Sequence, residues 1–247
     1  MPQYKMITAL CRGGGIGFQG TLPWPKLARD MRFFAEMTSS TDTPYNSAVI
    51  MGRKTWDSLP DTSKPLKYRD NIIISNRKFT SDDDDVLVAG ATGGVVVAPR
   101  NPCIHYIPHI HQIKESTADY DVAWIIGGAS IYEQVIYSNT IYIDEIYITF
   151  VDEHYEFDAA FPLMYQYDSV DEILHLRSSP LNRRLWTWTG AEDVPKFVSF
   201  DTGAYYSVED VDRDFISQLT RQSDLTAMKE RRIPDLRFLK LKRMLVM

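Results

Sequence analysis

Short apolar runs alternate with segments of helical periodicity along the first 150 positions of the chain. The runs cover residues 4–11, 47–51, 71–75 and 122–126. Runs of this length, ended by glycine or polar residues, are typical of strands buried on both faces. Leu27, Met31, Phe34 and Met37 recur at helical spacing after Pro25, which suits a first helical turn, and a second helix is expected from Gly128 to about Tyr137. The pattern predicts an α/β protein whose sheet is largely covered by helices.

The remainder of the chain carries a weaker pattern. Residues 140–150 alternate in character and predict a long strand. Residues 177–235 mix prolines, charges and aromatics without a sustained period, except for a helix expected near 208–220. Residues 236–243 predict a strand near an edge of the sheet, where lysines discourage aggregation. A basic tail that binds nucleic acid is the alternative interpretation of that last segment.

Length and composition narrow the class of protein. The 247 residues suit one large domain, and the net charge of -6 argues against nucleic-acid binding as the main purpose. Cys11 and Cys103 are too few for a disulfide framework, which fits a reducing compartment. The N-terminus lacks the apolar stretch of a signal peptide, and no apolar run is long enough to span a bilayer. We therefore expect a soluble, cytoplasmic protein.

The stretch GGGIGFQGTLPWP, residues 13–25, contains G-x-G-x-x-G between Gly15 and Gly20 and follows an apolar strand. In a Rossmann loop the last glycine opens a helix at once, because the helix N-terminus holds the pyrophosphate. Here Pro23 and Pro25 forbid a continuous helix. We reject the Rossmann interpretation, which leaves a surface loop or a lid that closes over a ligand.

Two other places have the order strand, glycine and helix N-terminus, which favours an anion. One is Gly52 followed by Arg53, Lys54 and Thr55, and the other is Gly127-Gly128 followed by Ala129, Ser130, Ile131 and Tyr132. Their combination indicates a ligand with more than one phosphate. Arg77 after a third strand suits a 2′-phosphate, and therefore NADP rather than NAD. The alternative is that these cations are ordinary surface residues.

Asp30 lies on the apolar side of the predicted helix over residues 26–37, beside Leu27 and Phe34, whereas Arg29, Arg32 and Glu36 point away. A carboxylate on a buried stripe is costly unless it is paired or used. An ionisable group in an apolar pocket suits the binding of a protonated nitrogen heterocycle. The alternative is a first-turn aspartate that complements the helix dipole.

Seven motifs occur in order: ITALCRGGGIGFQGTLPWP, LARDMRFF, VIMGRKTW, KPLKYRDNIIIS, WIIGGASIY, IYIT and FDAAFP. Together they resemble dihydrofolate reductases, and RLWTWTG with VPKF over 184–197 is similar to the fungal branch. The resemblance spans roughly residues 4–162. It implies an α/β fold with an eight-stranded mixed, mostly parallel sheet and flanking helices. Residues 1–247 are then expected to form a single domain, with a lineage-specific insertion at about 177–235 before the last strand.

The resemblance also implies NADPH-dependent reduction of 7,8-dihydrofolate to tetrahydrofolate in one-carbon metabolism. It implies a monomer that binds antifolates such as methotrexate and neither a membrane nor, as its main function, nucleic acid. The loop over residues 13–21 then acts as a mobile lid. The implied catalytic residues are Asp30, Trp24, Leu22 and Thr149. The implied substrate-binding residues are Ile7, Ala9, Asp30, Met31, Phe34, Leu59, Leu66, Arg69, Ile126, Tyr132 and Thr149.

The resemblance assigns a further set of residues to NADPH and a cis peptide bond to Gly127-Gly128. The cofactor-binding residues are Ala9, Ile16, Gly20, Gly52, Arg53, Lys54, Thr55, Ser75, Asn76, Arg77, Gly127, Gly128, Ala129, Ser130, Ile131 and Tyr132. No metal is implied. Three residues depart from the family pattern. Asn76 stands where many members have arginine, Ala159 where they have threonine, and Tyr68 where they have the glycine before Arg69.

Two other functions are compatible with parts of the pattern. A pyrimidine reductase of riboflavin synthesis shares the Gly-Gly turn, but is not expected to combine LPW, an acid at position 30 and Arg69. A non-catalytic folate- or nucleotide-binding protein is the other alternative, and measured turnover distinguishes it.

Overall fold

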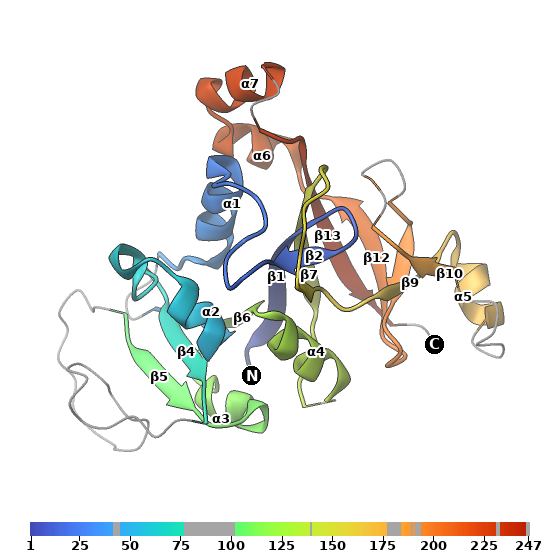
Figure 1. Cartoon of the computed structure of the whole chain (residues 1–247). Coiled ribbons are helices and arrows are strands. Elements are labelled where there is room, and N and C mark those ends of the chain that lie inside the picture. The colour runs from blue at the N-terminus through green and yellow to red at the C-terminus, as the bar shows by residue number, and fades with distance from the viewer. Residues whose placement is uncertain are drawn as a thin grey trace. The chain divides into compact units, whose positions relative to one another are not determined.

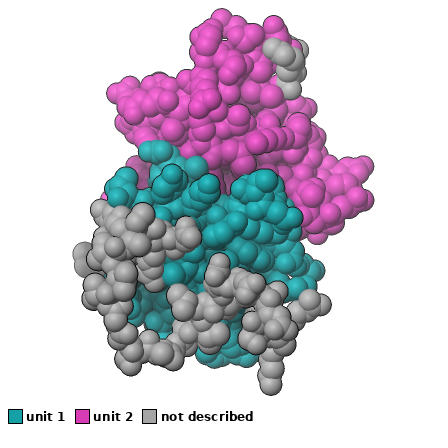
Figure 2. Space-filling view, turned by 90° about the vertical axis from the view of Figure 1, so that its left-hand side faces the viewer, with its two compact units in different colours: residues 1–6, 35–142 teal, residues 7–34, 143–247 magenta. Residues whose placement is uncertain are grey.

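The computed structural model describes residues 1–41, 45–76, 102–138, 140–176, 184–188, 190, 194–230 and 233–245. The chain forms two compact units, which Figure 2 shows in different colours. Unit 1 consists of residues 1–6 and 35–142, and unit 2 of residues 7–34 and 143–247. The chain passes from one unit to the other within strand β1 (Gln3–Cys11), within helix α1 (Ala28–Thr38) and after Tyr142. Strand β1 and helix α1 therefore have residues in each unit.

Unit 1 is built on parallel strands in the order β1-β6-β3-β4-β5 (Figure 1). The strands after β1 are β3 (Ser47–Gly52), β4 (Asp70–Ile74), β5 (Ile104–Ile107) and β6 (Val122–Gly127). The central side chains of β3, β4 and β6 are fully buried. This explains their almost uninterrupted apolar sequences, because a parallel sheet is covered on both faces. The strands predicted over 4–11, 47–51, 71–75 and 122–126 are therefore confirmed.

The helices of unit 1 begin where strands end. Helix α2 (Arg53–Ser58) follows β3 directly, and α4 (Ala129–Tyr137) follows β6 and packs against both β3 and β6. The end of α4 agrees with the prediction. The remaining helices of this unit are η1 (Asp61–Ser63), η2 (Ile110–Gln112) and α3 (Ile113–Ser116).

Unit 2 contains the strand order β10-β9-β11-β12-β13-β7-β1 and a separate two-stranded sheet of β2 and β8. The strands are β2 (Gly15–Gly17), β7 (Glu145–Val151), β8 (Ala159–Ala160), β9 (Met164–Tyr167), β10 (Arg184–Trp186), β11 (Phe197–Ser199), β12 (Tyr205–Asp210) and β13 (Leu236–Met244). The helices are α5 (Val170–Leu176), α6 (Arg213–Leu219) and α7 (Gln222–Lys229). Strand β13 pairs antiparallel with both β12 and β7.

The predicted α/β class with a mixed sheet and flanking helices is confirmed, but several details differ. Counting β1 once, the described residues contribute eleven strands to the main sheet rather than eight. The strand at 236–243 is not at an edge, because β12 and β7 pair with its two sides. Lys240 instead forms an ion pair with Glu145 at 2.7 Å. The strand expected over 140–150 begins only at Glu145.

Two further differences concern helices and the C-terminal segment. Helix α1 begins at Ala28 rather than at residue 26, so Pro25 lies before it. The described part of 177–235 contains three short strands and two helices, none longer than eight residues. Elements this short cannot build a sustained period in the sequence, although α6 confirms a helix near 208–220. Among the helices of the described residues, none has the length and apolar character needed to cross a membrane.

Candidate functional site

Asp30 of unit 2 is a buried carboxyl group in the first turn of α1, with only 5% of its surface exposed. The hydroxyl group of Thr149, from strand β7, donates a hydrogen bond to it. Burial disfavours the charged carboxylate and raises the pKa of Asp30 from 3.8 to about 6, and the bond from Thr149 opposes this rise in part. The position in the first turn fits the helix-dipole alternative, but the burial goes beyond what that role requires. Burial thus brings the pKa of Asp30 closer to neutral pH than that of an ordinary aspartate.

Trp24 and Leu22 precede the helix in the proline-stiffened segment. Trp24 is buried in a cluster with Cys11, Leu27 and Val151, and its ring meets Tyr155 edge-on with centroids 6.2 Å apart. Its indole nitrogen is buried, without a hydrogen-bond partner among the described residues. Leu22 is exposed.

The apolar face of α1 differs from the predicted one. Leu27 is buried, but Met31 is exposed and Phe34 only half-buried. Phe33, which the sequence analysis missed, is fully buried and lies 4.7 Å from Phe238 of β13, measured between ring centroids. The sequence carries no signal for this, because two of the aromatic partners of Phe33, Phe215 and Phe238, lie more than 180 positions away.

The same segment contacts the polar side of α1. Arg32 donates to the carbonyl oxygen of Leu219 at 2.8 Å and forms an ion pair with Asp224 of α7. Arg29 lies over the ring of Phe238 at 5.0 Å, and burial lowers the pKa of its guanidinium group. That side of the helix is therefore covered by α6, α7 and β13 rather than open to solvent. Helices α6 and α7 and strand β13 thereby support the helix that carries Asp30.

The glycine-rich loop is held by β8 and its flanking residues. β2 pairs with β8, and the backbone nitrogen of Gln19 donates to Asp158 at 2.9 Å. At Gly15 a Cβ atom would lie 2.3 Å from Cδ1 of Phe157, so only glycine fits without a shift. Gly20 has a φ of 80° and is exposed, and Ile16 is half-buried. No helix opens after Gly20, which agrees with the rejection of the Rossmann interpretation.

Trp188, from the expected insertion at about 177–235, closes the base of this loop. Its carbonyl oxygen accepts a hydrogen bond from the nitrogen of Gly13 at 2.9 Å, and its ring leaves no room for a side chain at Gly14. Its ring lies against that of Trp186, with centroids 3.6 Å apart and planes inclined by 33°. Ile7, which is buried, and Ala9, which is half-buried, complete the predicted site residues of unit 2.

In unit 1 the two glycine sites lie at the ends of neighbouring strands. Gly52 ends β3 and precedes α2, and Gly128 follows β6 and precedes α4; β3 and β6 are parallel. A Cβ atom at Gly52 would lie 2.9 Å from Cγ1 of Ile131, and one at Gly128 would lie 3.2 Å from Oγ1 of Thr55. The predicted cis peptide bond at Gly127-Gly128 is present. The absence of a side chain at Gly52 and Gly128 leaves the backbone accessible, and together with the N-terminus of α4 this suits the phosphates of a dinucleotide.

The other residues predicted around these glycines have mixed surroundings. Arg53 pairs with Asp57 at 3.4 Å, and Lys54 is exposed. Tyr132 is buried, and its hydroxyl oxygen lies 3.0 Å from where a Cβ atom at Gly127 would be. Ala129 and Ile126 are half-buried, and Ser130 accepts a hydrogen bond from Gln134 at 2.8 Å. Arg77 lies outside the described residues.

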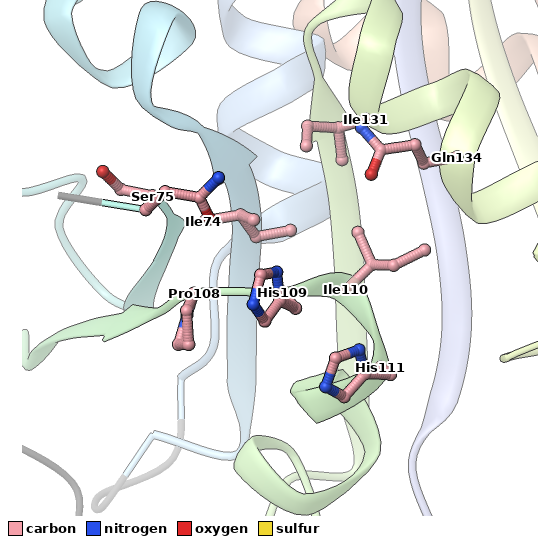
Figure 3. A pocket seen from close by; sticks show the side chains of 9 residues that line it. Ile74, Ser75, Pro108, His109, Ile110, His111, Ile131 and Gln134 are labelled. Carbon is pink, nitrogen blue, oxygen red and sulfur yellow. The ribbon is translucent and has the colours of Figure 1, made fainter.

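A pocket of about 390 Å³ opens next to this glycine site (Figure 3). Ser75, Asn76 and Ile131 were predicted at the cofactor and line it. The sequence analysis missed its other lining residues, Ile74, Pro108, His109, Ile110, His111 and Gln134. Pro108 to His111 directly follow β5, which pairs in parallel with β4. This position at the end of a strand was the sequence feature that could have indicated them.

Arg69 is 4% exposed and is held by the end of α1. Its guanidinium group donates to the hydroxyl groups of Thr38 and Ser39, and to the carbonyl oxygen of Lys67 at 2.8 Å. Burial lowers the pKa of Arg69 to about 10. The departure at Tyr68 has a structural consequence, since its φ of 64° is left-handed. Leu59 and Leu66 are half-buried on either side of η1.

The predicted site residues thus form two groups. Asp30 and Thr149 meet in unit 2, while Gly52, Thr55, Gly128 and Ile131 meet in unit 1. The buried acid of unit 2 is of the kind that reactions use, and the glycine turns of unit 1 suit a dinucleotide.

Comparison with known proteins identifies the family. The family model described as "Dihydrofolate reductase" matches residues 3–176. The chain is 35% identical over 178 residues to the dihydrofolate reductase of Heliothis virescens. The matched region covers 70% of this chain and 88% of that protein. The chain is 34% identical over 158 residues to the dihydrofolate reductase of Bos taurus, covering 63% of this chain and 76% of the bovine protein. The chain belongs to the dihydrofolate reductase family, whose members use a nicotinamide cofactor.

Proposed function

We propose that the protein catalyses the NADPH-dependent reduction of 7,8-dihydrofolate to 5,6,7,8-tetrahydrofolate. The observation that carries the proposal is the burial of Asp30 with the hydroxyl group of Thr149 as its partner. An ionisable group at this depth is costly to the fold, and perturbed acids of this kind concentrate where a reaction uses them.

Asp30 acts on the pterin ring by hydrogen bonding and charge. Its carboxyl group binds the N3 and 2-amino edge of the pterin, and Thr149 orients the carboxyl group for that contact. At neutral pH, above its pKa of about 6, Asp30 is mainly a carboxylate, whose charge stabilises the protonated or correctly tautomeric ring. The N5 proton comes from water, because Asp30 faces the opposite edge of the ring. When bound, NADPH supplies the hydride that C6 accepts.

Other residues of unit 2 shape the substrate site. Phe34 and Met31 are apolar and incompletely buried on α1, which suits contact with the pterin and benzoyl rings. Trp24 has a buried indole N–H that can hold an ordered water near Asp30. Ile7 contributes a backbone carbonyl group, and the loop over residues 13–21 excludes water from the reaction.

The remaining residues proposed for binding belong to unit 1. Arg69 pairs with the α-carboxylate of the glutamate tail, for which a planar guanidinium is suited, and Leu59 and Leu66 flank the benzoyl ring. Gly127 to Ile131 hold the pyrophosphate. The residues proposed for the adenosine phosphates are Arg53, Lys54, Thr55, Ser75, Asn76 and Arg77. A cytoplasmic, monomeric, antifolate-sensitive enzyme with one domain and a C-terminal insertion completes the proposal.

The test is NADPH oxidation by the purified protein, followed by absorbance at 340 nm, with and without dihydrofolate and with methotrexate as inhibitor. We expect oxidation that requires dihydrofolate and stops with methotrexate. Oxidation that instead requires the pyrimidine substrate of riboflavin synthesis would identify the same-fold alternative. Tight binding of NADPH and methotrexate without turnover would identify a non-catalytic binding protein.

A further inference from the structure

Three side chains that carry metal-binding atoms, Asp70, Cys103 and His105, lie together at the amino ends of two neighbouring strands of unit 1. Asp70 is the first residue of β4, and Cys103 lies directly before β5. The two strands are parallel, with Ile72 opposite His105, and Figure 1 shows them side by side. Because side chains two positions apart on a strand share a face, the three side chains belong to one face of the sheet.

The spacing of these side chains is close to that of ligands around one metal ion. Each residue offers one ligand atom, and the three atoms lie within 4.8 Å of one another. Around a tetrahedral zinc ion with bonds of about 2.0–2.3 Å, the ligand atoms are roughly 3.3–3.6 Å apart. Side-chain movements of about 1 Å therefore bring all three atoms onto one ion.

Hydrogen bonds already orient the carboxylate of Asp70. The backbone nitrogen of Cys103 donates to Oδ1 at 2.7 Å, and the hydroxyl group of Tyr120 donates to Oδ2 at 2.8 Å. A carboxylate has about four lone-pair positions, so these two bonds leave positions for a metal ion. Hydrogen bonds of this kind hold ligating side chains in place in metal sites. Asp70 and Cys103 are buried and His105 is half-buried, which limits competition from water.

The three kinds of ligand atom select the class of metal. Magnesium and calcium prefer sites made entirely of oxygen atoms, whereas zinc binds cysteine sulfur, histidine nitrogen and aspartate oxygen. Cysteine binds as the thiolate, so the Cys103 thiol releases its proton to solvent when the metal binds. The thiolate and the Asp70 carboxylate then balance the two positive charges of the ion, and a buried site requires such a balance.

We propose that Asp70, Cys103 and His105 form a zinc-binding site that joins the amino ends of β4 and β5, with water as the fourth ligand. The site is separate from the proposed cofactor residues Ser75 and Asn76, which follow the other end of β4. The family resemblance implies no metal, so the site is an addition to the proposed function. Residues 75–103 separate the two strands in sequence. An ion that binds only when the strands are paired stabilises the folded protein.

Cobalt(II) absorbance tests the proposal on the purified protein, freed of any affinity tag and dialysed against EDTA. Cobalt takes the place of zinc, and a thiolate ligand gives it an intense charge-transfer absorption in the near ultraviolet. We expect one cobalt ion per chain to produce this absorption together with the visible bands of a four-coordinate ion. Zinc should displace the cobalt and abolish both signals. Zinc should also raise the midpoint temperature of unfolding, by an amount that grows with the free zinc concentration.

Variants of the ligands and of their hydrogen-bond partner locate the site. Cys103→Ser is expected to lose the charge-transfer absorption. His105→Gln and Asp70→Asn should each weaken zinc binding about a hundredfold or more, as measured by isothermal titration calorimetry. Tyr120→Phe removes only the hydrogen bond to Asp70 and should weaken zinc binding about tenfold.

The matched controls are Cys11→Ser, which replaces the other cysteine of the chain, and His154→Gln, at an exposed histidine of unit 2. Neither should change the cobalt spectrum or the zinc affinity. Wild-type protein that binds no cobalt, or binds it without the charge-transfer absorption, would overturn the proposal even if the variants did not fold. An absorption that persists in Cys103→Ser, or is lost in Cys11→Ser, would also overturn it. None of these measurements depends on turnover, so they stand apart from the test of the proposed function.

Discussion

The substitution Asp30→Asn separates the cost of burying a charge from its use in the reaction. Because burial raises the pKa of Asp30, the folded protein prefers the protonated acid. Stability that is present below about pH 4 is therefore lost as pH rises through about 6 in the wild-type protein. The rise from 3.8 to about 6 corresponds to about 3 kcal/mol of unfolding free energy. Asparagine carries no charge, so the variant lacks this loss.

Urea unfolding followed by tryptophan fluorescence measures the effect in the ligand-free protein at about pH 4.5, 6 and 8. From the lowest to the highest pH, we expect the unfolding free energy of Asp30→Asn to rise by about 2–3 kcal/mol relative to that of the wild type. The asparagine N–H groups add a cost that does not vary with pH and cancels in this comparison. Asp119→Asn, an exposed carboxyl group of unit 1, is the control and should show no such gain. Parallel pH curves for Asp30→Asn and the wild type would refute the reasoning.

Three further predictions follow from packing and backbone geometry. Asp224→Asn should lower the free energy of unfolding in urea by about 3 kcal/mol, because it leaves Arg32 without its ion-pair partner. Replacing Asp224 by leucine and Arg32 by methionine together should restore part of the loss. Equal stability of the single variant and the wild type would contradict this. Gly15→Ala should lower turnover far more than Gly20→Ala, because only the Cβ atom at position 15 would lie 2.3 Å from Phe157. The Cβ atom at position 20 meets open space, and its positive φ costs about 1 kcal/mol. Steady-state rates of the two variants test this. Tyr68→Gly should slightly raise the midpoint temperature of unfolding, because glycine adopts the left-handed backbone at this position without strain. A lower midpoint would contradict this and would mean that contacts of the tyrosine ring stabilise the fold by more than the backbone strain destabilises it.

Local chemistry made much of the fold and part of the site predictable. The central residues of β1, β3, β4 and β6 are buried, so the sequences of these strands are mostly apolar. Glycine is favoured at positions 52 and 128, where two strands end, because a Cβ atom there would be crowded by Ile131 or Thr55. Asp30 was recognisable as an acid among apolar neighbours.

Contacts between distant segments were not predictable. Phe33, Arg29 and Arg32 take their surroundings from α6, α7 and β13, whose short elements give no periodic signal. Trp188 supports Gly13 and Gly14 across more than 170 positions of the chain. The pairing of His109 with His111 depends on the 3-10 turn that begins at Ile110, and spacing alone does not reveal it.

The central claim is that Asp30 serves the reduction of dihydrofolate. The most direct measurement is the pH profile of kcat/KM for dihydrofolate-dependent NADPH oxidation, compared between the wild type and Asp30→Asn. The account predicts a wild-type rate that falls as pH rises through an apparent pKa near 6, because the reaction consumes a proton. It also predicts that the variant binds NADPH normally, loses this inflection, and turns over about a hundredfold or more slowly at pH 7. A variant with nearly the wild-type rate and profile would contradict the account.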